Sequence, residues 1–135
     1  MHKKAYNNNA NIIIAVLEIW QAMSLESLKH INGNGGFFVS LNRSTTNSPS
    51  FSGFDKFNAP GALFNIISAR INNDTRPDIA GSQFTENMMS LFGNTSSVGA
   101  AGFTGPSYVP TGLRPWGIDG ADFDGDGMVD FVLAT

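Results

Sequence analysis

The sequence contains no cysteine, so neither disulfides nor thiolate zinc sites can stabilise the folded chain. Charge is also scarce, because 8 Lys and Arg residues and 11 Asp and Glu residues give a net charge of only −3 over 135 residues. The basic residues are scattered along the chain and form no basic stripe of the kind that nucleic acid requires. We therefore expect no nucleic-acid partner.

Long apolar runs are missing too. The apolar run Ile12–Leu17 is stopped by Glu18 and is far shorter than the roughly 20 residues that span a bilayer, so no membrane span is predicted. No A-x-A pattern follows it, which argues against a secretory signal peptide. We expect a strand at Ile12–Val16 and a short helix inside the N-terminal insertion Leu17–Ile31, which ends before the stop signal Asn32-Gly33.

The nine residues Asp122–Asp130 read D-F-D-G-D-G-M-V-D, with carboxylates at loop positions one, three, five and nine. Ca²⁺ takes about six to eight oxygen ligands, and a short loop supplies them from alternate residues. The pattern predicts a calcium site rather than a plain acidic turn. Gly127 would make the sharp turn, and the predicted ligands are the side chains of Asp122, Asp124, Asp126 and Asp130 with the backbone carbonyl of Met128.

The same spacing occurs in helix–loop–helix calcium sites, which also need a glutamate at loop position twelve. Here that position is Leu133. The loop is followed by the short apolar run Phe131–Ala134 and preceded by the glycine-interrupted Trp116–Ile118, neither of which is typical of an amphipathic helix. The loop is therefore predicted to join two strands.

The chain also contains internal repeats, because a shift of 52 residues (130 − 78) places Asp122–Asp130 on Arg70–Asp78. A fainter third copy is read at Asn7–Asn11, followed by the apolar run Ile12–Val16. The approximate repeats are 7–50, which is degenerate, 51–102, and 103–135, which is incomplete. The same shift aligns Phe51 with Phe103, Phe64 with Trp116, Ile66 with Ile118, Ala69 with Ala121, and Phe38–Asn42 with Ser90–Asn94. Because Phe64 and Trp116 share one repeat position, both are predicted to pack in the core.

A period near 52 residues with several short strands per unit is typical of the blades of a β-propeller, whose repeats run at about 40–50 residues. The predicted fold is all-β: a partial β-propeller of about two to three blades, with residues 1–135 as a single propeller segment. Propellers close with about four to eight blades. Additional blades, from the same chain or from an oligomer, are therefore the expected partners.

The stretches 68–80 and 103–134 resemble the FG-GAP repeat family, and most closely its bacterial FG-GAP-like, or VCBS, subtype. The resemblance covers roughly Phe37 to Thr135. It implies a β-propeller with calcium in loops between strands, and a role in adhesion, matrix or carbohydrate contact outside the cytoplasm. Integrin α-subunit head domains belong to this family.

The middle copy departs from the family's loop. Its equivalent positions are Arg70, Asn72, Asp74, Arg76 (carbonyl) and Asp78. It holds two carboxylates, and Thr75 replaces the glycine, so we expect this loop to bind calcium weakly or not at all. One hypothesis places the Arg70 guanidinium near Asp74 and Asp78, where it would replace the ion.

Catalytic residues are not predicted, because His2 and His30 have no partner at ligand or triad spacing, and the aspartates of the loop are assigned to calcium. The predicted function is therefore structural: a calcium-binding FG-GAP/VCBS repeat segment of a secreted or cell-surface protein, extracellular or periplasmic, that binds a protein or carbohydrate ligand. The alternatives are the propeller portion of a carbohydrate-active enzyme whose catalytic residues lie outside this chain, and a truncated reading frame without a function of its own.

Overall fold

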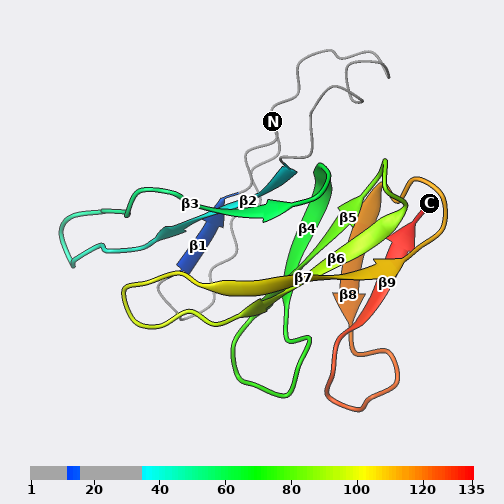
Figure 1. Ribbon diagram of the computed structural model, residues 1–135. Helices are drawn as coiled ribbons and strands as arrows, with labels where there is room; N and C mark the ends of the chain where they lie inside the picture. The colour runs from blue at the N-terminus through cyan, green and yellow to red at the C-terminus, as the bar shows by residue number, and fades with distance from the viewer. Residues whose placement is uncertain (1–11, 16–34) are drawn as a thin grey trace.

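The computed structural model describes residues 12–15 and 35–135, which form nine β-strands and no helix (Figure 1). The predicted all-β class is therefore confirmed. A strand lies at Ile12–Ala15, as predicted, whereas the short helix expected within Leu17–Ile31 falls outside the described residues. Among the residues described, none belongs to a helix long and apolar enough to cross a membrane.

The strands form three antiparallel sheets, each a simple meander in which chain neighbours pair (Figure 1). The first sheet contains β1 (Ile12–Ala15), β2 (Gly35–Leu41) and β3 (Asp55–Ala59). The second contains β4 (Leu63–Ala69), β5 (Asp78–Gln83), β6 (Met88–Asn94) and β7 (Phe103–Pro110). The third contains β8 (Gly117–Ala121) and β9 (Asp130–Ala134).

The four-stranded sheet is the one complete unit among the described strands, and the shift of 52 residues relates it to the other two. Ala69, which ends β4, corresponds to Ala121, which ends β8, and Asp78 and Asp130 begin β5 and β9. In the other direction, β2 and β3 correspond to β6 and β7. The fold is thus that of a partial propeller, as predicted. The predicted repeats start at Phe51 and Phe103, whereas the sheets start one strand later, at β4 and β8.

Alternation of side chains along the strands decides which faces are buried. In β2 the side chains of Phe37, Val39 and Leu41 are buried, which is the period of two that places alternate residues on one face of a strand. In β5 every residue is buried, because this strand lies between β4 and β6 and both faces of its sheet are covered. The outermost strand of that sheet, β7, is mostly exposed.

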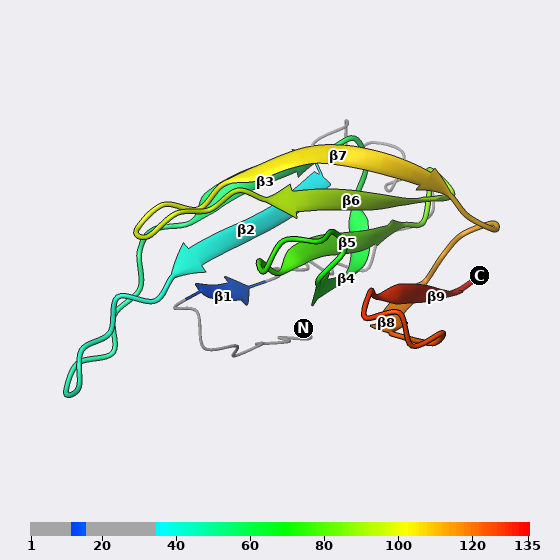
Figure 2. The same ribbon diagram turned by 90° about the horizontal axis from the view of Figure 1, so that it is seen from below.

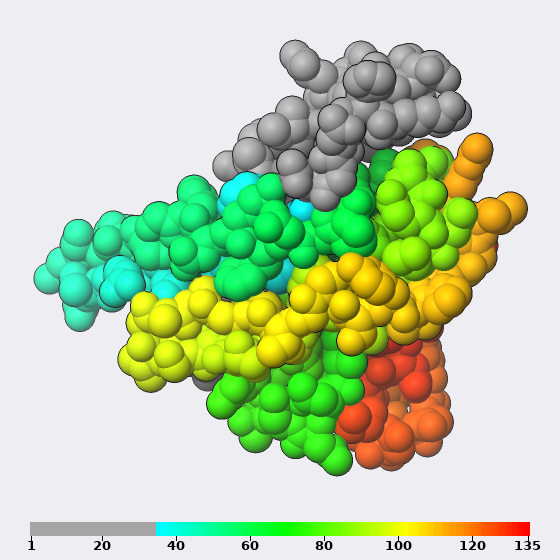
Figure 3. All heavy atoms as spheres, viewed as in Figure 1, coloured from blue at the N-terminus to red at the C-terminus, as the bar shows by residue number. Residues whose placement is uncertain are grey.

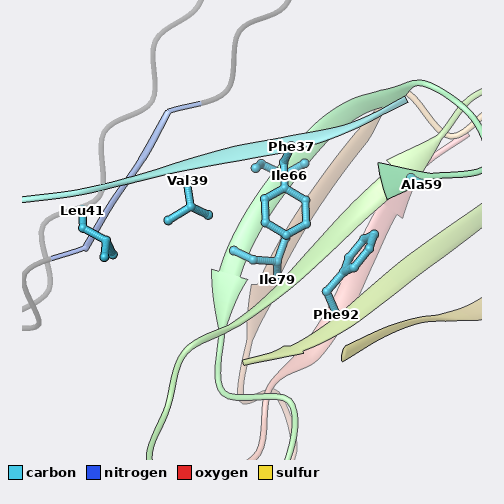
Figure 4. Close-up of a cluster of buried hydrophobic side chains, with 7 residues drawn as sticks. All are labelled: Phe37, Val39, Leu41, Ala59, Ile66, Ile79 and Phe92. Atoms are coloured by element: carbon cyan, nitrogen blue, oxygen red, sulfur yellow. The ribbon is translucent and has the colours of Figure 1, made fainter. Parts of the chain in front are cut away.

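Two apolar clusters cover the two faces of the four-stranded sheet. The first is drawn in Figure 4 and joins this sheet to β2 and β3; its buried members are Phe37, Val39, Leu41, Ala59, Ile66, Ile79 and Phe92. The second joins the same sheet to β8 and β9 on the opposite face; its buried members are Ile67, Ala80, Met89 and Ile118. Figure 2 shows β8 and β9 on one side of the four-stranded sheet. The sheets therefore stack face to face, as blades do.

The predicted core position of Trp116 is wrong. Its side chain is 56% exposed, and Phe64 is half-buried. The indole packs against Phe84 and Phe64 with ring centroids 4.4 and 5.8 Å apart. Trp116 precedes β8 rather than lying in it, and it belongs to neither of the two apolar clusters.

The hairpin loops after β2 and β6 have the same hydrogen bonds. Asn42 Oδ1 accepts the N–H of Ser44 at 2.8 Å, and Asn94 Oδ1 accepts the N–H of Ser96 at 2.9 Å. Each of these serines in turn accepts a backbone N–H from the far side of its loop. The two N-x-S sequences thus form Asx turns. The two hairpins project beside one another from the molecule (Figure 3) and are joined where Arg43 donates to the carbonyl of Gly99 at 3.2 Å.

Candidate metal centre

The Asp122–Asp130 loop is the connection between β8 and β9, so it joins two strands as predicted. One carboxylate oxygen from each of Asp122, Asp124 and Asp130 lies within 4.8 Å of the other two. Asp122 and Asp124 are exposed and Asp130 is half-buried. Three of the four predicted carboxylate ligands therefore lie together in a cluster that we call the triad carboxylates.

The carboxylates also hold the backbone of the loop in shape. Asp122 accepts the N–H groups of Gly125 at 2.7 Å, Asp126 at 3.1 Å and Gly127 at 2.9 Å. Asp130 accepts the N–H of Phe123 at 2.9 Å. These bonds curl the backbone around the side chain of Asp122, which is the residue at loop position one.

Two glycines allow this curled path. Gly125 has a φ of 82° and Gly127 a φ of 88°, both in the left-handed region that residues with a Cβ rarely adopt. The turn that the sequence assigned to Gly127 is therefore confirmed, and Gly125 makes a second one.

Asp126 and Met128 lie differently from the triad carboxylates. Asp126 Oδ1 accepts the N–H of Met128 at 2.7 Å, and Asp126 is not part of the three-residue cluster. The full ligand set thus stays a prediction, in which Asp126 and the Met128 carbonyl would join the triad carboxylates. All the donors are oxygens, which suits hard cations such as Ca²⁺ and not the thiophilic metals.

The Arg70–Asp78 loop between β4 and β5 shares some of these hydrogen bonds but not the left-handed turns, because Asn73 and Thr75, the equivalents of Gly125 and Gly127, do not have positive φ. Asn72 accepts the N–H of Asp74 at 2.8 Å, as Asp124 accepts that of Asp126 at 3.1 Å. Asp74 in turn accepts the N–H of Arg76 at 2.8 Å. Side-chain acceptors at loop positions three, five and nine are therefore common to the two loops, whereas the bonds to position one occur in the Asp122–Asp130 loop. Whether this loop binds calcium weakly or not at all stays a prediction.

Asp78 is buried and serves as a structural acceptor. It is 1% exposed, and its two oxygens accept the N–H groups of Asn94 at 2.7 Å and Ile71 at 3.1 Å. The Asn94 amide group donates back to the carbonyl of Pro77 at 2.7 Å. We call the two bonds that involve Asn94, from its N–H to Asp78 and from its side-chain amide to Pro77, the Asp–Asn latch. It ties the loop to the end of β6, and sequence reasoning missed it because the two residues are 16 positions apart in sequence.

The hypothesis that Arg70 replaces the ion is wrong. Within the described part of the chain, no hydrogen bond or ion pair joins the Arg70 guanidinium to Asp74 or Asp78. Asp78 is satisfied by backbone N–H groups instead. The nearby arginine that does reach the latch is Arg76, which donates to the carbonyl of Asn94 at 3.3 Å. His2 and His30 lie outside the described residues.

The described part of the chain thus consists of stacked antiparallel sheets with an acidic loop between β8 and β9. This arrangement is that of a propeller-type repeat protein. Residues 70–133 match the family model of the FG-GAP-like repeat, in agreement with the resemblance that the sequence shows. The matched segment begins in the Arg70–Asp78 loop and ends within β9, and it therefore contains both loops. No curated protein and no solved structure matches the chain.

Gly127→Ala is expected to lower the free energy of unfolding by about 1–2 kcal/mol, the cost of a left-handed conformation for a residue with a Cβ. No atom lies within 4 Å of the added Cβ, so the loss comes from the backbone alone. Urea denaturation in EDTA measures it. The matched control is Gly53→Ala, where the Cβ also meets nothing and φ is not left-handed. Equal losses in the two variants would contradict the assigned turn.

Proposed function

We propose that this chain is a calcium-binding FG-GAP/VCBS-type repeat segment of a secreted or cell-surface β-propeller protein. Its role is structural and adhesive rather than catalytic, and the propeller that it helps to build binds a protein or carbohydrate ligand. The observation that carries the proposal is the triad carboxylates, gathered in a loop that lies in the segment matching the FG-GAP-like repeat.

The electrostatics of the loop favour a divalent cation. Three carboxylate oxygens within 4.8 Å of one another repel, and a bound cation would replace that repulsion with attraction. The predicted ligands come from the loop and from Asp130, the first residue of β9. Calcium would supply positive charge and bonds to the loop oxygens, and no other chemistry. These bonds would hold the start of β9 close to the end of β8.

An extracellular setting is consistent with such a site. Exposed loops of this kind in extracellular modules bind calcium with dissociation constants of about 10⁻⁴–10⁻³ M. Affinity in that range is useful only where calcium is abundant. Because the chain has no cysteine, no disulfide can cross-link this loop, and a bound ion would take that part.

Calcium at ~10 mM is expected to raise the free energy of unfolding by about 1.4–2.7 kcal/mol, which follows from dissociation constants of about 10⁻⁴–10⁻³ M. Urea denaturation of the full chain, in EDTA and in calcium, measures the difference. Isothermal titration of the folded protein should show the matching heat. A chain with neither heat nor stabilisation would overturn the calcium site.

Asp124→Asn is expected to remove most of this gain. It installs the residue that the middle loop carries naturally as Asn72, and its amide oxygen can still accept the N–H of Asp126. Asp126→Ala is likewise expected to abolish the gain. The control is Asp74→Ala in the middle loop, which should leave the calcium effect unchanged. Equal responses in the two loops would show that the ion is assigned to the wrong one.

A further inference from the structure

An exposed tryptophan and an exposed arginine rest on one buried ring. Phe84, in the hairpin between β5 and β6, is 5% exposed, and Trp116 packs on it with ring centroids 4.4 Å apart. The Arg114 guanidinium lies over the same ring, 5.6 Å from its centroid. Trp116, Arg114 and Leu113 are all exposed, and Leu113 reaches 76%. We call these three residues the platform.

The platform lies at the end of the sheets opposite to the calcium loop. β5 ends and β8 begins at the platform, whereas the Asp122–Asp130 loop follows the end of β8. Figure 1 shows the β5–β6 hairpin and the β7–β8 connection near the start of β8, with the β8–β9 loop beyond its other end. The platform and the candidate metal centre therefore share no residue.

Hydrogen bonds hold the β7–β8 connection in place on both sides. Asn87 accepts the N–H of Arg114 on its side-chain oxygen at 2.8 Å and the N–H of Thr111 on its carbonyl at 3.0 Å. The N–H of Trp116 donates to the carbonyl of Ala134 at 2.8 Å. A surface that is fixed before a ligand arrives loses little conformational freedom on binding.

Two residues of this region have a strained backbone. Arg114 has a φ of 56° and Asn87 a φ of 55°, and they are the residues other than glycine with positive φ in the described part of the chain. Side chains with a Cβ rarely adopt this left-handed conformation. Such strain persists where the surrounding structure imposes it, and it is concentrated at ligand sites.

The accessibility of this position is a property of the complete sheet as well. Phe64 holds the repeat position of Trp116 in the four-stranded sheet, and both Phe84 and Trp116 pack against its ring. Phe64 nevertheless stays only half-buried. Arg114 and Leu113 belong to the connection that leaves this complete sheet.

The two exposed groups suit one class of ligand. The face of an indole packs on apolar C–H groups, such as those on one side of a sugar ring. A guanidinium stacked on an aromatic ring keeps its N–H groups free at the edge, and these can pair with a carboxylate through two parallel hydrogen bonds. Among the described residues, none forms a hydrogen bond or ion pair with the Arg114 side chain.

We propose that the platform binds an acidic carbohydrate, with one sugar ring stacked on the Trp116 indole and the carboxylate of a uronic acid on the Arg114 guanidinium. This inference narrows the ligand of the proposed function from a protein or carbohydrate to a polyuronate. It rests on the adhesive part of that function and does not need calcium. The indole provides affinity for the ring, and the guanidinium selects the charged sugar over a neutral one.

Isothermal titration of the full chain with tetragalacturonate, in EDTA, tests the site. Saturable binding is expected, and neutral maltotetraose should bind at least ~10-fold more weakly because it offers no carboxylate for a charge-assisted hydrogen bond. Arg114→Gln should weaken tetragalacturonate binding by the same factor and leave maltotetraose binding unchanged. The matched control is Arg70→Gln, which removes the same charge at an exposed position in the β4–β5 loop and should change neither affinity.

Tryptophan fluorescence tests the stacking. The chain has two tryptophans, so Trp20→Phe leaves Trp116 as the one that remains. The emission of this variant should shift as tetragalacturonate is added, with the same midpoint as the heat of binding. Trp116→Ala should weaken the binding of both tetrasaccharides, and Trp116→Phe, which keeps an aromatic ring, should restore part of it.

Equal affinities for the two tetrasaccharides would contradict the role of Arg114, and an unchanged emission would contradict stacking on Trp116. Tighter binding of a sulfated dextran oligosaccharide than of tetragalacturonate would overturn the assignment to a carboxylate. Failure to bind any of these sugars would overturn the inference in favour of a protein ligand, because exposed Trp and Arg are also typical of protein interfaces.

The sugar site and the calcium site fail separately. A chain that calcium stabilises but that binds no sugar loses the present inference alone. Sugar binding in EDTA without any effect of calcium on stability would remove the calcium site and leave the platform in place.

Discussion

Phe37→Ala is expected to lower the free energy of unfolding by about 3–5 kcal/mol, the usual cost of removing a buried aromatic ring. Phe37 is 1% exposed and lies at the centre of the first cluster (Figure 4). Its ring centroid is 5.3 Å from Phe57, 5.0 Å from Phe92 and 5.2 Å from Phe103. These rings come from β3, β6 and β7, so the loss would loosen the contact between two sheets. Such a loss is a large part of the total of about 5–15 kcal/mol typical of a domain.

Urea denaturation followed by far-ultraviolet circular dichroism measures this loss. Phe51→Ala is the matched control, because that ring is 49% exposed and belongs to neither cluster. A change of less than about 1 kcal/mol is expected there. If the two variants lost the same amount, the contact between β2 and the four-stranded sheet would not be the main source of stability.

Asp78→Ala is the second large effect, with an expected loss of about 2–4 kcal/mol. The substitution removes the acceptor of two backbone N–H groups, and leaving a buried donor unsatisfied costs about 1–3 kcal/mol. The Asn94 bond is buried and the Ile71 bond is partly buried, so the second donor recovers some hydration from water. The reason for the loss is therefore hydrogen bonding and not charge pairing.

Asp130→Ala in EDTA is the control for Asp78→Ala. Asp130 holds the same repeat position but accepts one exposed N–H, that of Phe123, so a loss below about 1 kcal/mol is expected. Amide hydrogen exchange at Asn94 should accelerate in Asp78→Ala and stay unchanged in Asp130→Ala. Unchanged exchange at Asn94 in both variants would contradict the Asp–Asn latch.

Much of the fold could be predicted from local sequence. The strands on both sides of Asp122–Asp130 follow from Leu133 at loop position twelve and from the short apolar run after the loop, since both argue against helices. The repeat of 52 residues correctly relates β4 to β8 and β5 to β9. The turn at Gly127 follows from the spacing of carboxylates around it. The strands and the turn are decided within a few neighbouring residues, whereas the repeat is found by comparing segments 52 residues apart.

The candidate site was only partly predictable. The alternation of aspartates places Asp122, Asp124 and Asp130 together, but it did not separate them from Asp126, whose carboxylate bonds to the backbone of Met128 instead. The repeat position that Trp116 shares with Phe64 did not reveal its exposure, because Trp116 lies just before β8 whereas Phe64 lies within β4. The sequence suggested that the Arg70 guanidinium is the partner of Asp78, but the carboxylate of Asp78 accepts two backbone N–H groups instead.

The sequence by itself determined the β class, the repeat and the acidic loop, because side-chain period, glycine conformation and ligand spacing act between residues close along the chain. The tertiary structure alone decided how strands group into sheets and which carboxylate is buried. These features depend on contacts between residues distant in sequence, such as Asp78 with Asn94 and Phe37 with Phe103. The energy of these contacts depends on burial, and the residues are buried only when neighbouring sheets stack on one another.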